Sequence, residues 1–180
     1  MDLDFRLETE RLCLRPYREE DVDDLHAMFS DSEHMTWYPA PFTREESEAW
    51  LQRQLARYRD PGFGLLLVED RVTGEFLGTV GPASMVVEGV EHVEIGWHTK
   101  PGRKGEGIAP EAATAARDWA FENLEVDHLI SLVRPENTGS NRVAEKIGMR
   151  VDREVDHKAL RHFVYRIDRH SWQERAAVGR

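Results

Sequence analysis

Apolar residues recur along the chain with two different periods, which separate the predicted helices from the predicted strands. Apolar side chains recur at helical spacing in residues 22–29, within an otherwise acidic stretch, and predict a first amphipathic helix. Thr43 and Glu46 form a capping-box pattern, which predicts a second helix that starts at Thr43. Pro61 and Gly62 cannot continue that helix, so we expect it to end before them.

Alternating or continuous apolar runs predict strands in the rest of the chain. They span residues 5–15, 63–69, 75–87, 90–97, 128–133, 149–155 and 160–167. A turn through Asp70 and Gly74 joins the second of these strands to the third as a hairpin. Gly81 and Pro82 interrupt the third strand and predict either a bulge or an edge position there.

Two further helices are expected between the later strands. One runs from Pro110, in the first helical position, to about Asn123, and a short one covers residues 140–147 and is closed by Gly148. The polar C-terminal tail, residues 168–180, is expected to add little. This order of elements predicts an α/β fold with helices packed on a mixed, largely antiparallel sheet.

Composition and charge narrow the class of protein. Without repeats, low-complexity segments or a linker, the 180 residues are expected to form one domain over positions 1–180. With 34 acidic against 24 basic residues the formal charge is −10, which disfavours a nucleic-acid partner. No apolar run is long enough for a membrane span, and residues 1–4 lack the features of a signal peptide. The single cysteine, Cys13, fits a cytoplasmic location, and the eight histidines show no metal-ligand spacing, so no metal is expected.

A glycine-rich, basic loop lies between the predicted strand at 90–97 and the helix that follows it. Residues 99–110 read T-K-P-G-R-K-G-E-G-I-A-P, with the glycines Gly102, Gly105 and Gly107 and the cations Lys100, Arg103 and Lys104. Glycines let the backbone adopt positive φ and approach a ligand closely, and free N–H groups ahead of a helix bind anions. The pattern fits neither a P-loop nor a dinucleotide-binding fingerprint, which needs a glycine where Pro110 stands. The loop is therefore predicted to bind a phosphorylated ligand, because a tight connection alone would need neither the glycines nor the cations.

Two blocks of the sequence lie in an order and spacing typical of a known family. The first is Lys104-Gly105-Glu106-Gly107-Ile108-Ala109, and the second is Glu136-Asn137-Thr138-Gly139-Ser140, leading into residues 145–149. Together they resemble the GNAT (Gcn5-related) N-acetyltransferase superfamily, and within it the ribosomal-protein-alanine N-acetyltransferase (RimJ/RimL-type) branch. Lys104 replaces the family's Arg or Gln, and Met149 replaces an aromatic residue. Residues 11–16 also resemble the opening strand of this branch, so the resemblance covers essentially the whole chain.

The resemblance implies the GNAT fold and transfer of an acetyl group from acetyl-CoA to a primary amine. Two central strands, here 90–97 and 128–133, are expected to splay apart and hold the pantetheine arm between them. The residues expected to contact acetyl-CoA are Ile95, Trp97, Arg103, Lys104, Gly105, Glu106, Gly107, Ile108, Ala109, Asn137 and Lys146. Trp37 and Tyr38 lie where the family's acceptor pocket forms, and they either line that pocket or close the core.

Direct attack of an amine on a thioester needs an unprotonated amine and a proton for the departing thiolate. Glu94 is the first candidate for the general base, through a water, and His92 is the second. The alternative for Glu94 is a charge paired on a solvated sheet face. Ala144 replaces the tyrosine that donates the leaving-group proton in many family members. Ser140, which matches a serine of the branch, is then expected to hydrogen-bond the sulfur or to cap the helix, and Asn137 to lie near the thioester or bond its own backbone.

The sequence leaves the acceptor open between a protein N-terminus and a small amine. An enzyme that acts through a ternary complex is expected, and the absent tyrosine at Ala144 keeps a non-catalytic acyl-CoA-binding sensor or interaction module as the alternative. Residues 19–33 carry seven acids and no Lys or Arg, which either attract a cationic acceptor or serve solubility. A homodimer, common among relatives, is a further expectation.

Overall fold

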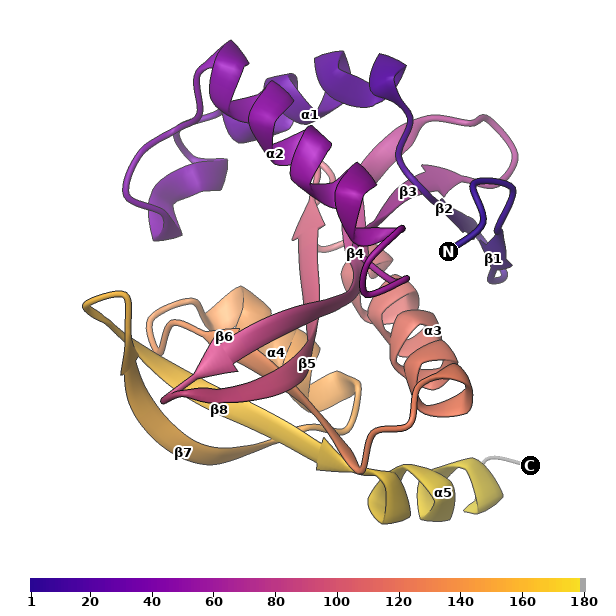
Figure 1. Cartoon of the computed structure of the whole chain (residues 1–180), viewed down its shortest axis with the longest axis vertical. Helices are drawn as coiled ribbons and strands as arrows, with labels where there is room; N and C mark the ends of the chain where they lie inside the picture. The colour runs from indigo at the N-terminus through magenta and orange to yellow at the C-terminus, as the bar shows by residue number, and fades with distance from the viewer. Residues whose placement is uncertain (179–180) are drawn as a thin grey trace.

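An eight-stranded mixed sheet runs through residues 1–178, the part of the chain that the computed structural model describes (Figure 1). The strands are β1 (Leu7–Glu8), β2 (Leu12–Arg15), β3 (Leu66–Asp70), β4 (Phe76–Val87), β5 (Val90–Thr99), β6 (His128–Val133), β7 (Arg150–His157) and β8 (Leu160–Asp168). The helices are α1 (Val22–Phe29), α2 (Arg44–Arg57), α3 (Ile108–Asn123), α4 (Thr138–Lys146) and α5 (Arg169–Val178), with short 3-10 turns η1 (Glu19–Asp21) and η2 (His34–Trp37).

The strands lie in the order β1-β2-β3-β4-β5-β6-β8-β7, and of the adjacent pairs only β5 and β6 run parallel. The largely antiparallel sheet and the β3–β4 hairpin are therefore confirmed. β3 begins at Leu66 rather than at residue 63. β3 pairs with β4 from Phe76 to Val80, so Pro82 has a described partner strand only on the β5 side. The edge alternative is correct for Pro82, and the irregularity in the pairing lies instead between Val68 and Glu69.

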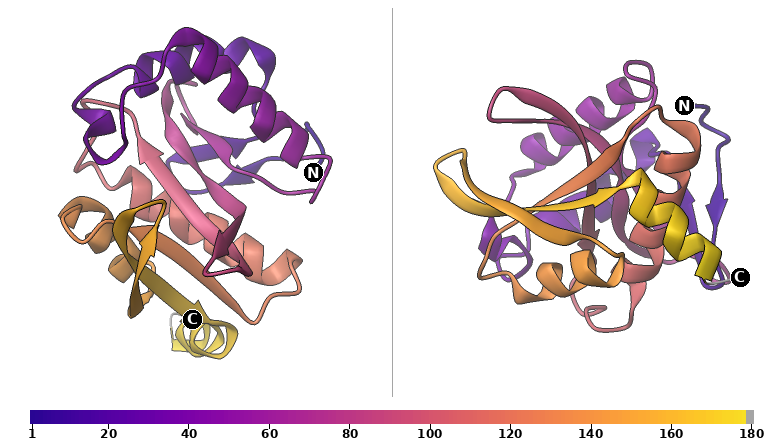
Figure 2. Two further views of the ribbon diagram at one scale, coloured as in Figure 1. Left: turned by 60° about the vertical axis from the view of Figure 1, so that its left-hand side comes forward. Right: turned by 90° about the horizontal axis from the view of Figure 1, so that it is seen from below.

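Helices cover the sheet in two groups. α1 packs on α2, whereas α3 packs against β4 and β5, and α4 contacts α3 and β6. Figure 2 shows the α1–α2 pair and the α3–α4 pair at different ends of the molecule, with the strands running between them. The capping box of α2 is formed as expected, because Thr43 Oγ1 accepts the Glu46 N–H at 3.2 Å and Glu46 Oε2 accepts the Thr43 N–H at 2.8 Å. Across residues 1–178, the helices lack the length and apolar content that a membrane span requires.

Two predicted helix starts are wrong by two residues. α3 begins at Ile108 instead of Pro110, with Gly107 as its N-cap at φ 81°. Pro110 is tolerated in the third helical position because an N–H there also lacks a partner within the helix. α4 begins at Thr138 instead of residue 140, and its predicted stop is confirmed. Gly148, at φ 88°, donates its N–H to the Glu145 carbonyl, which completes a left-handed C-terminal cap.

The C-terminal segment corrects the expectation that residues 168–180 add little, although residues 179–180 lie outside the described part. α5 packs on α3, and the Trp172 ring stacks on Phe121 with centroids 5.0 Å apart. Arg169 donates to the Phe121, Leu124 and Val126 carbonyls at 2.6–2.9 Å. These carbonyls belong to the end of α3 and the loop after it, so α5 satisfies groups that the helix leaves without partners.

Candidate active site

The two central strands part because side chains replace the backbone ladder between them. The register of β5 and β6 pairs only Glu94 with Ile130. One residue further along each strand, Ser131 Oγ donates to the Ile95 carbonyl at 2.7 Å. The Leu132 N–H, which could continue the ladder, donates to Glu94 Oε1 at 3.0 Å. The expected splay of these strands is thus confirmed by their pairing.

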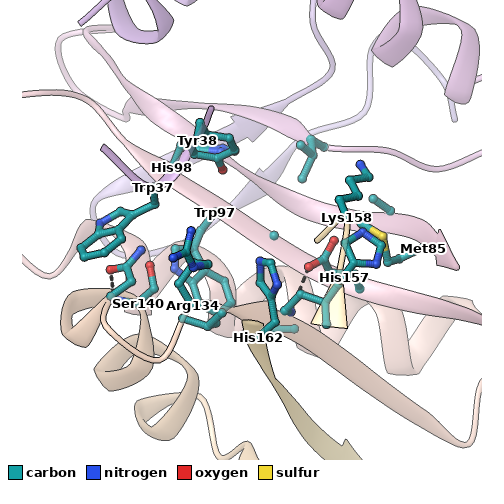
Figure 3. A pocket seen from close by; sticks show the side chains of 18 of the residues that line it. Trp37, Tyr38, Met85, Trp97, His98, Arg134, Ser140, His157, Lys158 and His162 are labelled. Atoms are coloured by element: carbon teal, nitrogen blue, oxygen red, sulfur yellow. Dashed lines mark hydrogen bonds between the residues drawn. The ribbon is translucent and has the colours of Figure 1, made fainter. Parts of the chain in front are cut away.

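A cavity of about 580 Å³ opens at this gap (Figure 3). Segments that are distant in sequence line it, including η2, α2, β5, β6, the start of α4 and the β7–β8 hairpin. The predicted site residues in its lining are Trp37, Tyr38, Glu94, Ile95, Trp97, Asn137 and Ser140. The fold therefore brings the expected base, the expected sulfur partner and the expected acceptor-pocket aromatics to one cavity.

His92, the second candidate base, lies outside the lining of this cavity. Its position on β5 precedes Glu94, before the strands part, and its Nδ1 is 3.0 Å from His128 Nε2. Burial lowers the pKa of both imidazoles. Lys146 is exposed at the end of α4 and also lies outside the lining. Of the two candidate bases, Glu94 is the one that the fold places at the cavity.

Glu94 occupies an environment that resists its ionisation. Burial raises the pKa of its carboxyl, while the hydrogen bond from the Leu132 N–H and the charges of Arg57 and Lys158 oppose that rise. This is not the solvated sheet face of the alternative expectation. A carboxylate with a raised pKa binds a proton more readily near neutral pH, as a general base must.

Asn137 caps α4 and thereby frees Ser140 for another use. Asn137 is the N-cap, and its Oδ1 accepts the Ser140 N–H at 3.1 Å. The capping role weighed for Ser140 thus belongs to Asn137, three residues before it, and the local backbone bond expected of Asn137 is present. Ala144, where the family has a tyrosine, is fully buried and is not one of the residues that line the cavity. Ser140 is then the hydroxyl that α4 presents to the cavity.

The loop between β5 and α3 has the backbone conformation that anion binding needs. Gly102, Gly105 and Gly107 have φ values of 79°, 90° and 81°, which L-residues rarely adopt. Because Gly107 is the N-cap, the unpaired N–H groups of the first turn of α3 follow directly. Arg11 supports this loop from the start of β2, since its Nη1 donates to the Glu106 carbonyl at 3.0 Å.

The cations of this loop are partly neutralised by an acid that the sequence pattern did not connect with them. Glu75, at the start of β4, lies 3.2 Å from Lys100 Nζ and 3.7 Å from Arg103 Nη2. Arg103 also approaches Glu106 at 3.4 Å, whereas Lys104 is exposed. A bound phosphate would compete with Glu75 for two of the cations. We therefore expect the backbone amides of the loop to contribute more to phosphate binding than these cations do.

Tyr38 is held by His98, a residue that the sequence analysis did not single out. Tyr38 Oη lies 2.6 Å from His98 Nε2, and His98 Nδ1 lies 3.0 Å from Thr79 Oγ1. Burial lowers the pKa of His98 to about 3, so the ring is neutral and offers one donor and one acceptor nitrogen. Burial and the charge of Glu94 raise the pKa of Tyr38 to about 12. Tyr38 and His98 are 60 positions apart, and no local pattern could have joined them.

Known proteins resemble this chain both in sequence and in fold. The sequence profile of the acetyltransferase (GNAT) domain matches residues 11–150. The chain is 32% identical over 156 residues to the uncharacterized protein YkkB of Bacillus subtilis (strain 168), covering 86% of this chain and 91% of that one. It is similar to the crystal structure of an acetyltransferase from Agrobacterium tumefaciens str. C58, with a TM-score of 0.79 and 33% identity over 93% of this chain and 98% of that one. A ribosomal L7/L12 alpha-N-protein acetyltransferase, RimL, solved with coenzyme A, shares the fold alone, with a TM-score of 0.74 and 14% identity over 91% of this chain and 98% of that one.

Proposed function

This chain belongs to the GNAT acetyltransferase family, and we propose that it moves an acetyl group from acetyl-CoA to a primary amine by direct attack in a ternary complex. Family membership makes the chain an enzyme of the acyltransferase type, so the non-catalytic alternative is dropped. The observation that carries the finer proposal is the position of Glu94, whose carboxyl both opens the gap between β5 and β6 and lines the cavity. The RimJ/RimL-type branch is supported only by the motif resemblance.

The residues present fit acetyl-CoA. The amides that follow Gly105 and Gly107 would hold its pyrophosphate at the start of α3, and Ile95 and Trp97 would lie along its pantetheine arm. Because β5 and β6 pair at one position only and Ser131 takes the Ile95 carbonyl, the β5 backbone beyond Ile95 has no ladder to β6 and is available to an extended ligand on that side. Acetyl-CoA supplies an activated thioester that an amine can attack.

The protein then has two proton tasks. As the acceptor nitrogen bonds to the acetyl carbon and the carbon–sulfur bond breaks, Glu94 accepts the proton that the amine loses. The sulfur departs as a thiolate that accepts a hydrogen bond from the Ser140 hydroxyl, and it becomes the thiol by taking up the proton that Glu94 then releases, so that Glu94 returns to its starting state. Near neutral pH, deprotonating a lysine-type amine costs roughly 4–5 kcal/mol, and an α-amine about 1 kcal/mol. The demand on Glu94 therefore depends on the acceptor.

Release of free CoA from acetyl-CoA should depend on an added amine. We expect release to rise with at least one member of a panel of amino acids, amino-acid amides, peptides with free N-termini and polyamines, each supplied alone. The measurement is thiol release with a chromogenic reagent, together with a thermal-shift titration with CoA. A protein that binds CoA but releases none with any amine would contradict the proposed transfer.

Replacing Gly105 with alanine should weaken CoA binding by about tenfold, which is about 1.4 kcal/mol. At φ 90° an alanine is strained, so the loop rearranges and its amides leave their positions. Gly89 is a matched control, because it has φ 81° and, like Gly105, has no atom within 4 Å of an added Cβ. Gly89→Ala should cost similar stability and leave the Kd for CoA, measured by calorimetry, unchanged. Equal effects on Kd would show that the loop conformation does not bind CoA.

A further inference from the structure

The cavity lining is rich in positive charge, whereas the chain as a whole has a net negative charge. Acids outnumber Lys and Arg by 34 to 24 in the sequence, yet the charged residues in the lining are four cations and one acid. They are Arg53, Arg57, Arg134, Lys158 and Glu94. None of the acids of residues 19–33 lines the cavity, so the acidic segment does not face the bound acceptor. The expectation that acidity attracts a cationic acceptor therefore finds no support at the site.

Two of these cations, Arg134 and Lys158, lie at opposite ends of the cavity. In Figure 3, Arg134 lies with Ser140 and Trp97, and Lys158 lies with His157 at the opposite end. Arg134 Nε is 3.6 Å from a Glu136 carboxylate oxygen, so Arg134 already has an acidic neighbour. The end that holds Ser140 is the one we assign to the thioester. The end that holds Lys158 is left for the acceptor.

Arg57 and Lys158 approach Glu94 from different parts of the fold. Arg57 is at the end of α2, and Lys158 is in the β7–β8 turn, and the charges of both act on the Glu94 carboxyl. Arg57 is half-buried and donates from Nη1 to Gln54 Oε1 at 3.3 Å. The ion pairs found within residues 1–178 include none from Arg57, Lys158 or Arg53. Two cations without carboxylate partners in the described chain thus line the same cavity as the expected base.

The turn that carries Lys158 is formed by residues that do not favour its conformation. Lys158 and Ala159 connect β7 to β8 with φ values of 50° and 61°, the left-handed pattern for which two-residue hairpins usually use Asn-Gly. A lysine at such a position is strained, and strained residues concentrate at functional sites. The turn therefore holds an ammonium group at the cavity at a cost in stability that a purely structural turn would avoid.

We propose that the acceptor is a small amine that also carries a carboxylate, of the amino-acid type. Its amine lies at Glu94, and its carboxylate binds Arg57 and Lys158. This inference rests on the proposed function. The carboxylate is not consumed: the acceptor nitrogen bonds to the acetyl carbon as the carbon–sulfur bond breaks, and the proton that Glu94 takes from the nitrogen passes to the departing sulfur, which leaves as the thiol. Binding of an anion by a guanidinium and an ammonium group excludes the doubly cationic amines, which would meet like charges there.

Pairs of acceptors that differ only in the carboxylate test this inference separately from the proposed acetyl transfer on which it rests. We expect kcat/KM for amino acids to exceed that for their amides by at least about tenfold, the ratio expected when one charge-assisted interaction is lost. Decarboxylated amines and a peptide series serve as further probes. Amides, peptides or polyamines that match or outperform the free amino acids would overturn the inference while leaving the transferase intact. Absence of CoA release with every probe would instead overturn the proposed function.

Substitutions of Arg57 and Lys158 test whether these two cations cause the preference for acceptors that carry a carboxylate. Arg57→Gln and Lys158→Gln should each reduce the ratio of kcat/KM for amino acid to amide, and the double variant should bring it close to one. Activity on the amide is the internal measure that each variant is folded. The controls are Arg59→Gln and Arg161→Gln, exposed cations on the same two segments that do not line the cavity. An unchanged ratio in the double variant, or an equal loss in the controls, would refute the assignment.

Discussion

Glu94→Gln should lower kcat/KM by about a hundredfold or more near neutral pH and, at the same time, raise the Tm of the protein. Glutamine keeps an oxygen that can accept the Leu132 N–H, so the strands stay parted, but it cannot take a proton from the amine. The loss should shrink as the assay pH approaches the pKa of the acceptor, because the amine then arrives unprotonated. Rate profiles over pH with an amino-acid acceptor measure both effects.

The rise in Tm follows from the direction of the pKa shift. Burial raises the pKa of Glu94 above its ordinary value of 4.5 in the folded protein. Its contribution to stability is therefore fully present below that value and is lost as the pH rises through the folded pKa. Near neutral pH the charged carboxylate destabilises the fold, and a neutral amide does not. The difference in Tm between the two proteins should vanish in acid.

Glu91→Gln is the control for both measurements, because Glu91 is an exposed acid on the same strand. It should change neither rate nor Tm. Full activity of Glu94→Gln with every acceptor would show that Glu94 is not the base. A fall in Tm near neutral pH would show that its carboxylate stabilises the fold.

Gly78→Ala should be the most destabilising single methyl addition, lowering the free energy of unfolding by about 3 kcal/mol or more. Gly78 has φ 151°, and an added Cβ would lie 2.2 Å from the His98 carbonyl oxygen. The obstructing atom is backbone in the middle of the sheet, since Gly78 pairs with Thr99 on one side and Val68 on the other. Relief requires β4 and β5 to separate.

Thermal and urea unfolding of Gly78→Ala and Gly96→Ala test this. Gly96 has no positive φ, and an added Cβ there would meet only the end of the Leu65 side chain at 3.4 Å. Gly96→Ala should therefore cost less than about 1.5 kcal/mol. Equal Tm values for the two variants would contradict the close approach of the strands at Gly78.

Local patterns predicted the parts of this structure that depend on neighbours in sequence. Thr43 with Glu46 marked the start of α2, Gly148 marked the end of α4, and the glycines of the loop predicted its positive φ values. Each of these features is decided within a few residues by backbone conformation or capping. Spacing also placed Glu94 and Ser140 in one cavity, because the resemblance carried the fold with it.

The remaining features depend on contacts between distant segments. His92 shares a strand with Glu94, but only Glu94 stands at the position where β5 and β6 pair and then separate, and periodicity does not show where a ladder stops. The residues after Asp168 read as a polar tail, yet Arg169 fits the end of α3. Arg57 and Lys158 line one cavity with Glu94 although they are distant in sequence, and neither belongs to a motif.

With acceptor recognition by Lys158 as proposed above, the β7–β8 turn is a specificity element that can be exchanged. Its two residues connect β7 to β8 between His157 and Leu160, and they belong neither to the loop before α3 nor to the cap of α4. Sequence change at Lys158 and Ala159 can therefore alter which amine is accepted while the machinery for the acetyl donor stays the same. A library randomised at only these two positions would sample new acceptors in an otherwise unchanged transferase, and Gly or Asn at position 159 would release strain for further substitutions elsewhere.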